Sequence, residues 1–413
     1  MTDRPGGATN DRIGSLDLIR GIAVLGILAI NIGGFAGPGV ETVSPNYMGR
    51  VPAADEWTFA ATFLLFEGKM RALFTMLFGA SMVLFIERNE ANGRPGMALQ
   101  VRRLLWLALF GYLHFLLFWW GDILFFYALA GMLALPLRRL RPALLAAIGI
   151  GVFTLWNVQG IVQTLPGVVA EERILQGEAS PAEIAADKKL TGQFRDYAER
   201  EAAGIRAGFA EHVRMKLADD PLEPLGAAIE WLGETLPLIL IGMALYGSGF
   251  FSGGWSRAAL RRTAALGVVF GGAIALALLA WVMPRHFPLR AMGMLSHYGS
   301  AFEHLLMAAG YAAALVIAAP RLLAMRIGAR IDAAGKMAFS NYLGTTVLMT
   351  ALFNGWGLGL FDRFGPLEQV PFVLLGWALM LAWSKPWLTR YRRGPLEWLW
   401  RCLVEWRLLP NRR

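Results

Sequence analysis

The apolar residues of this chain gather in ten blocks of about 20 residues, separated by polar connections. A helix of about 20 apolar residues can cross the hydrocarbon core of a bilayer, which is about 30 Å thick. The pattern predicts an all-α, polytopic membrane protein with about ten transmembrane helices, and the short fourth block leaves nine or eleven as alternatives. The blocks cover residues 18–37, 70–87, 103–121, 122–137, 143–165, 228–251, 260–283, 298–319, 337–357 and 368–388.

The composition supports this class. Of the 413 residues, 56% are hydrophobic and only 17% are charged, against about 25% charged in an average soluble domain. These values exclude a disordered chain and argue against a soluble enzyme. The single cysteine, Cys402, excludes a disulfide framework within the chain and a cysteine metal cage.

The net charge of +9 would favour nucleic-acid binding in a soluble protein, but a membrane protein acquires such a charge from basic cytoplasmic loops. Every second connection is rich in Lys and Arg, whereas the short loops between them hold few. This alternation predicts a multi-pass membrane protein with both termini in the cytoplasm. The expected partners are the lipid bilayer and a small-molecule, lipid or glycan acceptor; no nucleic acid is expected, and a homo-oligomer is left open.

Four units follow along the chain. Residues 1–165 hold the first five predicted membrane helices, and residues 228–388 hold the second five. Between them, residues 166–227 combine mixed charge with helical apolar spacing, which predicts two or three amphipathic helices on the extracytoplasmic side. They form either a cap or a passive spacer. Residues 389–413 alternate Trp and Arg and predict an amphipathic cytoplasmic helix from about Pro395 to Leu408.

One set of ionisable residues, Asp17, Arg20 and Lys336, lies at the cytoplasmic ends of predicted spans. Asp17 and Arg20 are three residues apart and share a helix face. They form either a structural ion pair or part of a site for a cofactor phosphate. Asn31 follows Arg20 by eleven residues, about 16 Å along the same helix at 1.5 Å per residue, and therefore approaches the outer side.

A second set of ionisable residues gathers in the outer halves of the spans. Charged groups in a bilayer are costly, so a functional cavity is the first hypothesis. Interfacial charges and helix–helix hydrogen bonds are the alternatives. No metal is expected, because the histidines lack the HExxH spacing of zinc proteases. The set comprises Glu67, Lys69, Arg71, His114, Asp122, Glu234, Glu303 and His304.

Several of these residues lie in motifs that resemble the YeiB-like family of bacterial inner-membrane proteins, defined by domain of unknown function 418. The two motifs near the end of the chain are the most specific. The matching stretches are Leu16-Asp17-Leu18-Ile19-Arg20-Gly21, Phe66-Glu67-Gly68-Lys69, Gly121-Asp122-Ile123-Leu124, Gly335-Lys336-Met337-Ala338 with Asn341-Tyr342-Leu343, and Gly394-Pro395-Leu396-Glu397-Trp398.

The first of these motifs also resembles the start of transmembrane acyltransferases, namely relatives of heparan-α-glucosaminide N-acetyltransferase and the sugar O-acyltransferases of acyltransferase family three. This resemblance implies acyl-CoA or acetyl-CoA as a cytoplasmic donor and an acceptor on the far side. In the O-acyltransferases a catalytic His stands eleven residues after the arginine, where this chain has Asn31. The heparan enzymes also have Asn at this place and carry a His in the outer loop that follows. The corresponding loop of this chain reads Gly39-Val40-Glu41-Thr42 and holds no His.

The leading hypothesis is an acyltransferase that moves an acyl group from acyl-CoA to an extracytoplasmic or lipid-linked acceptor. His114 or Asp122 would act as general base, and Asn31 would stabilise the oxyanion. Arg20 and Lys336, with Asp17 beside Arg20, would hold the cofactor phosphates. The rival hypothesis is a transporter or exporter of a small molecule or envelope precursor, in which the outer charged set binds the substrate. A scaffold protein would leave the intramembrane charges unexplained.

Overall fold

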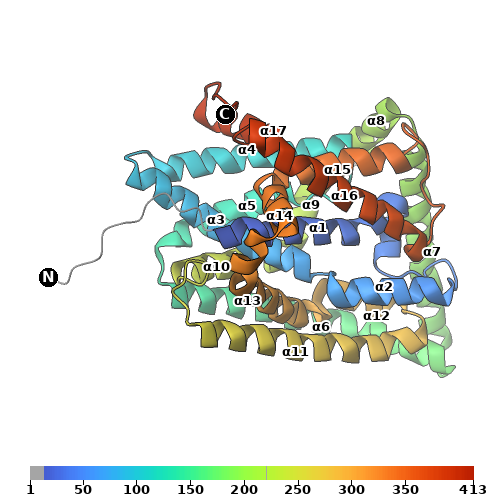
Figure 1. Cartoon of the computed structure of the whole chain (residues 1–413). Coiled ribbons are helices and arrows are strands. Elements are labelled where there is room, and N and C mark those ends of the chain that lie inside the picture. The colour runs from blue at the N-terminus through green and yellow to red at the C-terminus, as the bar shows by residue number, and fades with distance from the viewer. Residues whose placement is uncertain (1–13, 220) are drawn as a thin grey trace.

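The computed structural model describes residues 14–219 and 221–413, and its regular structure is helical throughout that part of the chain. Residues 1–13 of the expected N-terminal unit lie outside the described residues. The long helices run side by side, and α7 crosses one end of the bundle (Figure 1). In chain order, the α-helices are α1 (Gly14–Ala36), α2 (Ala53–Leu65), α3 (Lys69–Ala91), α4 (Gly96–Leu117), α5 (Leu124–Ala134), α6 (Pro142–Gln176), α7 (Pro181–Arg206), α8 (Phe209–Asp219), α9 (Glu223–Glu230), α10 (Leu232–Gly247), α11 (Arg257–Val282), α12 (Leu289–Met294), α13 (Ala301–Ala324), α14 (Arg326–Lys336), α15 (Ala338–Phe353), α16 (Pro366–Arg390) and α17 (Pro395–Glu405).

Each of the ten apolar blocks contains a helix, but not all of these helices are long and apolar enough to cross a membrane. Among the described residues, six segments are long and apolar enough. The pair α9 and α10, bent by 62°, raises the number to seven if it counts as one span. The shorter α5 and α15, with 11 and 16 residues, are outside this set. The class of helical membrane protein is therefore confirmed, whereas the expected count of about ten is not.

The pattern of apolar blocks did not predict α2. This helix carries Asp55 and Glu56 in its first turn, which hid it among the polar connections. It leads into α3 through a break in which Gly68 has a φ of +67°. Together α2 and α3 form one of the six candidate spans, 39 residues long.

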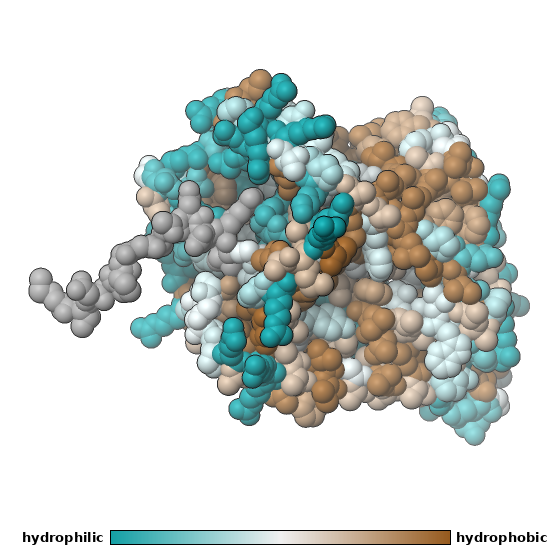
Figure 2. Space-filling view, viewed as in Figure 1, coloured by the Kyte–Doolittle hydropathy of each residue, from teal (hydrophilic) through white to brown (hydrophobic). Residues whose placement is uncertain are grey.

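Burial separates central from peripheral helices. In its most apolar stretch α1 is 67% buried, whereas α6, α11 and α16 are each 28% buried. The peripheral helices expose large side chains such as Leu155 and Val269, which suit contact with lipid tails. Figure 2 shows hydrophobic residues over the middle of one face, with hydrophilic residues toward both ends. This distribution is typical of a protein that crosses a bilayer.

Small residues allow the central helices to approach closely, as in many membrane proteins. A Cβ atom at Gly335 of α14 would lie 1.8 Å from the carbonyl oxygen of Asp17 in α1. A Cβ at Gly242 of α10 would lie 1.9 Å from the carbonyl oxygen of Met76 in α3. The backbones at these two contacts therefore require glycine, and they fix α1 and α3 in the middle of the molecule.

Within residues 166–227, α6 continues to Gln176, α7 and α8 follow, and α9 begins at Glu223. The buried side of α7 consists of Ala198, Ala202 and Ile205. Glu201 accepts a 2.9 Å hydrogen bond from the backbone N–H of Gly39, in the short helix η1 (Gly39–Thr42). The C-terminal tail also forms a helix, α17, which packs on α4 and α15. Trp400 of α17 donates a hydrogen bond to the carbonyl oxygen of Arg103.

Candidate functional site

A chain of hydrogen-bonded side chains joins α4, the α4–α5 connection and α15. Asp122 Oδ1 lies 2.8 Å from His114 Nδ1, and His114 Nε2 lies 3.0 Å from Thr346 Oγ1. The three residues are at most 2% exposed. The turn after α4 brings His114 and Asp122 together, and α15 supplies Thr346 from 232 residues away.

The surroundings of Asp122 fix the roles of the histidine nitrogens. Asp122 Oδ2 accepts a hydrogen bond from the backbone N–H of Phe125, so the carboxylate is held on both oxygens. An ionised Asp122 can only accept, and Nδ1 of His114 must therefore carry the proton. Nε2 is then left as an acceptor. The one proton of the Thr346 hydroxyl has two acceptors within reach, His114 Nε2 at 3.0 Å and the carbonyl oxygen of Tyr342 at 3.2 Å. This order of groups is the one that activates a hydroxyl for proton removal.

Asn31 lies on the opposite side of Thr346. Both residues line a cavity of about 10 Å³ between α1, α15 and α16, together with Phe35, Tyr342 and Met380. Such a volume is about the minimum that holds one water molecule. The ring of Tyr342 also covers His114 at a centroid distance of 5.3 Å. Asn31 and Thr346, the last member of the His114 chain, therefore line one small and mostly apolar cavity.

The predicted anion site at the start of α1 has a more extended form than the sequence indicates. Arg20 donates to Asp17 at 2.6 Å and to Ser81 of α3 at 2.9 Å. The charges of Arg20 and Arg401 both act on Arg103, so three guanidinium groups share this end of the bundle. Like charges repel, and such a cluster favours an anionic ligand.

Lys336, by contrast, forms an ion pair with Asp332 one turn earlier in α14. The structure thus places Asp17 and Arg20 together and gives Lys336 a partner that the sequence analysis did not consider. Arg103 and Arg401 were missed as members of the cluster. Their only sequence signal was that both lie in basic connections beside predicted membrane segments.

Lys69 and Glu303 form a fully buried ion pair between α3 and α13. The Lys69 ammonium donates to Glu303 Oε1 and to the carbonyl oxygen of Phe63, each at 2.7 Å. His304 lies beside the pair, with Nε2 3.3 Å from Glu303 Oε1. Neither Lys69 nor Glu303 lines the cavities described here, so they contact one another and not an open site.

Arg71 and Glu234 form a second pair that joins α3 to α10. Both contacts between the guanidinium and the carboxylate measure 3.2 Å. The guanidinium also lies 4.4 Å from the centre of the Trp231 ring. The outer charged set is therefore divided into separate interhelical pairs.

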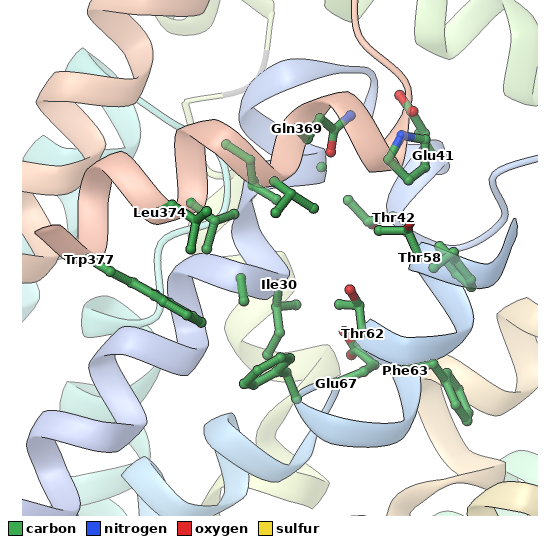
Figure 3. Close-up of a pocket in the computed structure, with 18 of the residues that line it drawn as sticks. Ile30, Glu41, Thr42, Thr58, Thr62, Phe63, Glu67, Gln369, Leu374 and Trp377 are labelled. Atoms are coloured by element: carbon green, nitrogen blue, oxygen red, sulfur yellow. The ribbon is translucent and has the colours of Figure 1, made fainter. Parts of the chain in front are cut away.

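Glu67, the remaining member of the outer set, lines a larger cavity of about 190 Å³ between α1, η1, α2 and α16 (Figure 3). Glu41 of η1 lines it as well. Burial, together with the nearby charges of Asp362 and Asp55, raises the pKa of Glu41 to about 8. In the sequence, Glu41 stands out only as part of an outer loop that holds no histidine.

The arrangement of acidic and histidine side chains does not favour a metal. Among the described residues, no group of three or more His, Cys, Asp or Glu side chains is placed to hold a metal ion.

The comparisons with known proteins agree with the motifs. The uncharacterized protein YeiB of Escherichia coli (strain K12) is 32% identical over 390 residues, which cover 94% of this chain and 95% of that protein. The chain belongs to the YeiB-like family. The uncharacterized protein YxaH of Bacillus subtilis (strain 168) is 30% identical over 401 residues, or 95% of this chain and 94% of its own.

The model of the family described as "Protein of unknown function (DUF418)" matches residues 245–407. This region of the YeiB-like chain runs from the end of α10 past α17 and includes Thr346, but not His114 or Asp122. An uncharacterized 39.9 kDa protein from Bacillus acidopullulyticus is 26% identical over 98% of this chain. No solved structure matches the chain.

Proposed function

We propose that this protein transfers an acyl group from acyl-CoA or acetyl-CoA to a hydroxyl or amine of an extracytoplasmic or lipid-linked acceptor. The observation that carries the proposal is the order Asp122–His114–Thr346, with 2.8 and 3.0 Å between successive polar atoms. A carboxylate, an imidazole and a hydroxyl in this order recur on unrelated folds that perform acyl transfer.

The chemistry follows from the hydrogen bonds. Nε2 of His114 takes the proton of the Thr346 hydroxyl, which takes the proton of the acceptor as the acceptor attacks the thioester carbonyl. Asp122 stabilises the imidazolium that forms, and the Asn31 amide donates a hydrogen bond to the oxyanion. The tetrahedral intermediate then collapses, the carbon–sulfur bond breaks, and the CoA thiolate leaves with the proton that His114 returns.

The donor phosphates would bind at the cluster of Arg20, Arg103 and Arg401. Planar guanidinium groups suit phosphate, because each offers two parallel N–H donors. The cluster lies at the basic end of the bundle, which supports an inner-membrane protein with this end in the cytoplasm. Asn31 lies further along the same helix, so α1 would connect the donor side with the reaction site.

The test uses purified protein and radiolabelled acetyl-CoA. Arg20→Ala should weaken acetyl-CoA binding at least tenfold in calorimetry, since one phosphate contact is lost. Thr346→Val and His114→Gln should leave binding unchanged and abolish transfer to an envelope extract. Arg214→Ala, on the exposed face of α8, is the matched control. An unaltered protein that binds no acetyl-CoA would refute the proposal.

Transport of a small molecule or envelope precursor is the second candidate function. The observation in its favour is the 62° bend between α9 and α10, because broken membrane helices are common at transporter binding sites. A transporter would move a solute across liposomes in an Arg71-dependent and Glu234-dependent manner without consuming acetyl-CoA. Acyl transfer in detergent solution, where no gradient exists, would instead favour the enzyme.

A further inference from the structure

The 190 Å³ cavity is separate from the proposed reaction site. It lies against Ile30, Ile32 and Gly33 of α1, whereas the small cavity beside Thr346 lies against Ile27, Leu28 and Asn31, and the two have no lining residue in common. The larger cavity has about 190 Å³, against about 10 Å³ for the smaller one. It is therefore a second, independent binding space.

Its polar side carries two carboxyl groups and no cation. Glu41 and Glu67 both line it. The charge of Glu67 also interacts with those of Lys69 and Arg71 outside the cavity. No Lys, Arg or His is among the lining residues. The nearby cations Lys69 and Arg71 are already paired with glutamates. Burial and the charges of Asp362 and Asp55 raise the pKa of Glu41, so its ionised form lacks a stabilising partner. A cationic ligand would supply that partner, because a buried carboxylate without one is costly.

Its other side is apolar and reaches the molecular surface. Figure 3 shows Leu374 and Trp377 of α16 on the side away from Glu41 and Thr58. Leu374 is 53% exposed and Val370 is 36% exposed, and both line the cavity. Since α16 is a candidate membrane span with a mostly unburied surface, the opening at Leu374 would face lipid tails.

We propose that this cavity binds an amphiphile with a primary ammonium head and an alkyl chain. The head lies between Glu41 and Glu67, where Thr42, Thr62 and Gln369 add hydrogen-bonding groups, and the chain leaves past Leu374 toward the bilayer. An inorganic cation would use only the polar half of the space. The inference concerns binding alone, so it does not depend on acyl transfer.

The ammonium head could belong to an aminophospholipid or to a free long-chain amine. The test compares decylammonium, decanol and decanoate at equal mole fraction in dodecyl maltoside micelles with the full-length protein, using the thermal unfolding midpoint as the readout. Decylammonium should raise the midpoint most, decanol less and decanoate not at all. Equal effects of decylammonium and decanoate would overturn the proposal.

Substitutions test whether the decylammonium response arises in this cavity. The double variant Glu41→Gln/Glu67→Gln keeps the shape of the cavity. It should need at least a tenfold higher decylammonium concentration to reach the same rise in the unfolding midpoint. The exposed Glu178→Gln variant is the control and should respond like the unaltered protein. A double variant that elutes as a folded protein and keeps the full response would refute the assignment. A Leu374→Trp variant should reduce the response to decylammonium but not to butylammonium.

A binding measurement in membranes identifies which molecule supplies the ammonium head group. In nanodiscs that contain phosphatidylethanolamine, an aminophospholipid ligand would compete and lower the apparent affinity for decylammonium relative to pure phosphatidylcholine. Equal affinities in the two membranes would indicate a free amine.

Discussion

Replacing Lys69 by methionine should destabilise the protein by about 3–5 kcal/mol, because the substitution leaves Glu303 as a buried charge without its cation. Both side chains are 0% exposed. The ammonium donates to Glu303 Oε1 and to the carbonyl oxygen of Phe63, so two acceptors lose their donor at once. His304 Nε2 lies 3.3 Å from the same carboxylate oxygen, and Glu67 also acts electrostatically on the pair.

The double replacement Lys69→Met/Glu303→Met should cost far less than either single replacement. Methionine has a length similar to that of both residues, and removing both charges also removes their desolvation cost. The double-mutant cycle should therefore give a coupling energy of at least about 3 kcal/mol. Reversible unfolding in mixed micelles, followed by tryptophan fluorescence as the denaturing detergent increases, measures each free energy.

The exposed pair of Arg214 and Glu211 in α8 provides the matched control, and its double-mutant cycle should show no measurable coupling. A coupling energy below about 0.5 kcal/mol for Lys69 and Glu303, the range of an exposed pair, would refute the argument. It would mean that water reaches the pair and that α3 and α13 are not held together by it.

Three further outcomes are expected. Gly68 and Gly177 have a similar positive φ, but only Gly177 has open space around it. Gly68→Ala should therefore lower the free energy of unfolding by more than about 2 kcal/mol, and Gly177→Ala by only about 1 kcal/mol. Unfolding in mixed micelles compares the two variants. Burial raises the pKa of Glu201 to about 7. The folded state therefore holds a proton that the unfolded state releases, and protection of α7 from hydrogen exchange should fall between pH 5 and 8 but not in a Glu201→Gln variant. Reporter fusions should place Arg139 in the cytoplasm and Asp196 outside; a cytoplasmic Asp196 would overturn the proposed orientation.

The sequence by itself determined the class of this protein and the position of most of its apolar helices, but not of α2. Hydropathy is a local property, and a run of about 20 apolar residues must form a helix in lipid because every backbone polar group needs an internal partner. The pairing of His114 with Asp122 was also within reach of sequence reasoning. The two residues flank one short turn, so a helical hairpin suffices to bring them together.

Only the tertiary structure decided which charges meet and where space remains. Thr346 reaches His114 across 232 residues, and Glu303 reaches Lys69 across 234. No local pattern encodes such contacts, because they depend on the order and rotation of helices in the bundle. The cavity beside Glu41 and Glu67 has the same origin. It exists because α2, α1 and α16 pack without filling the space between them, and that space is a property of three surfaces together.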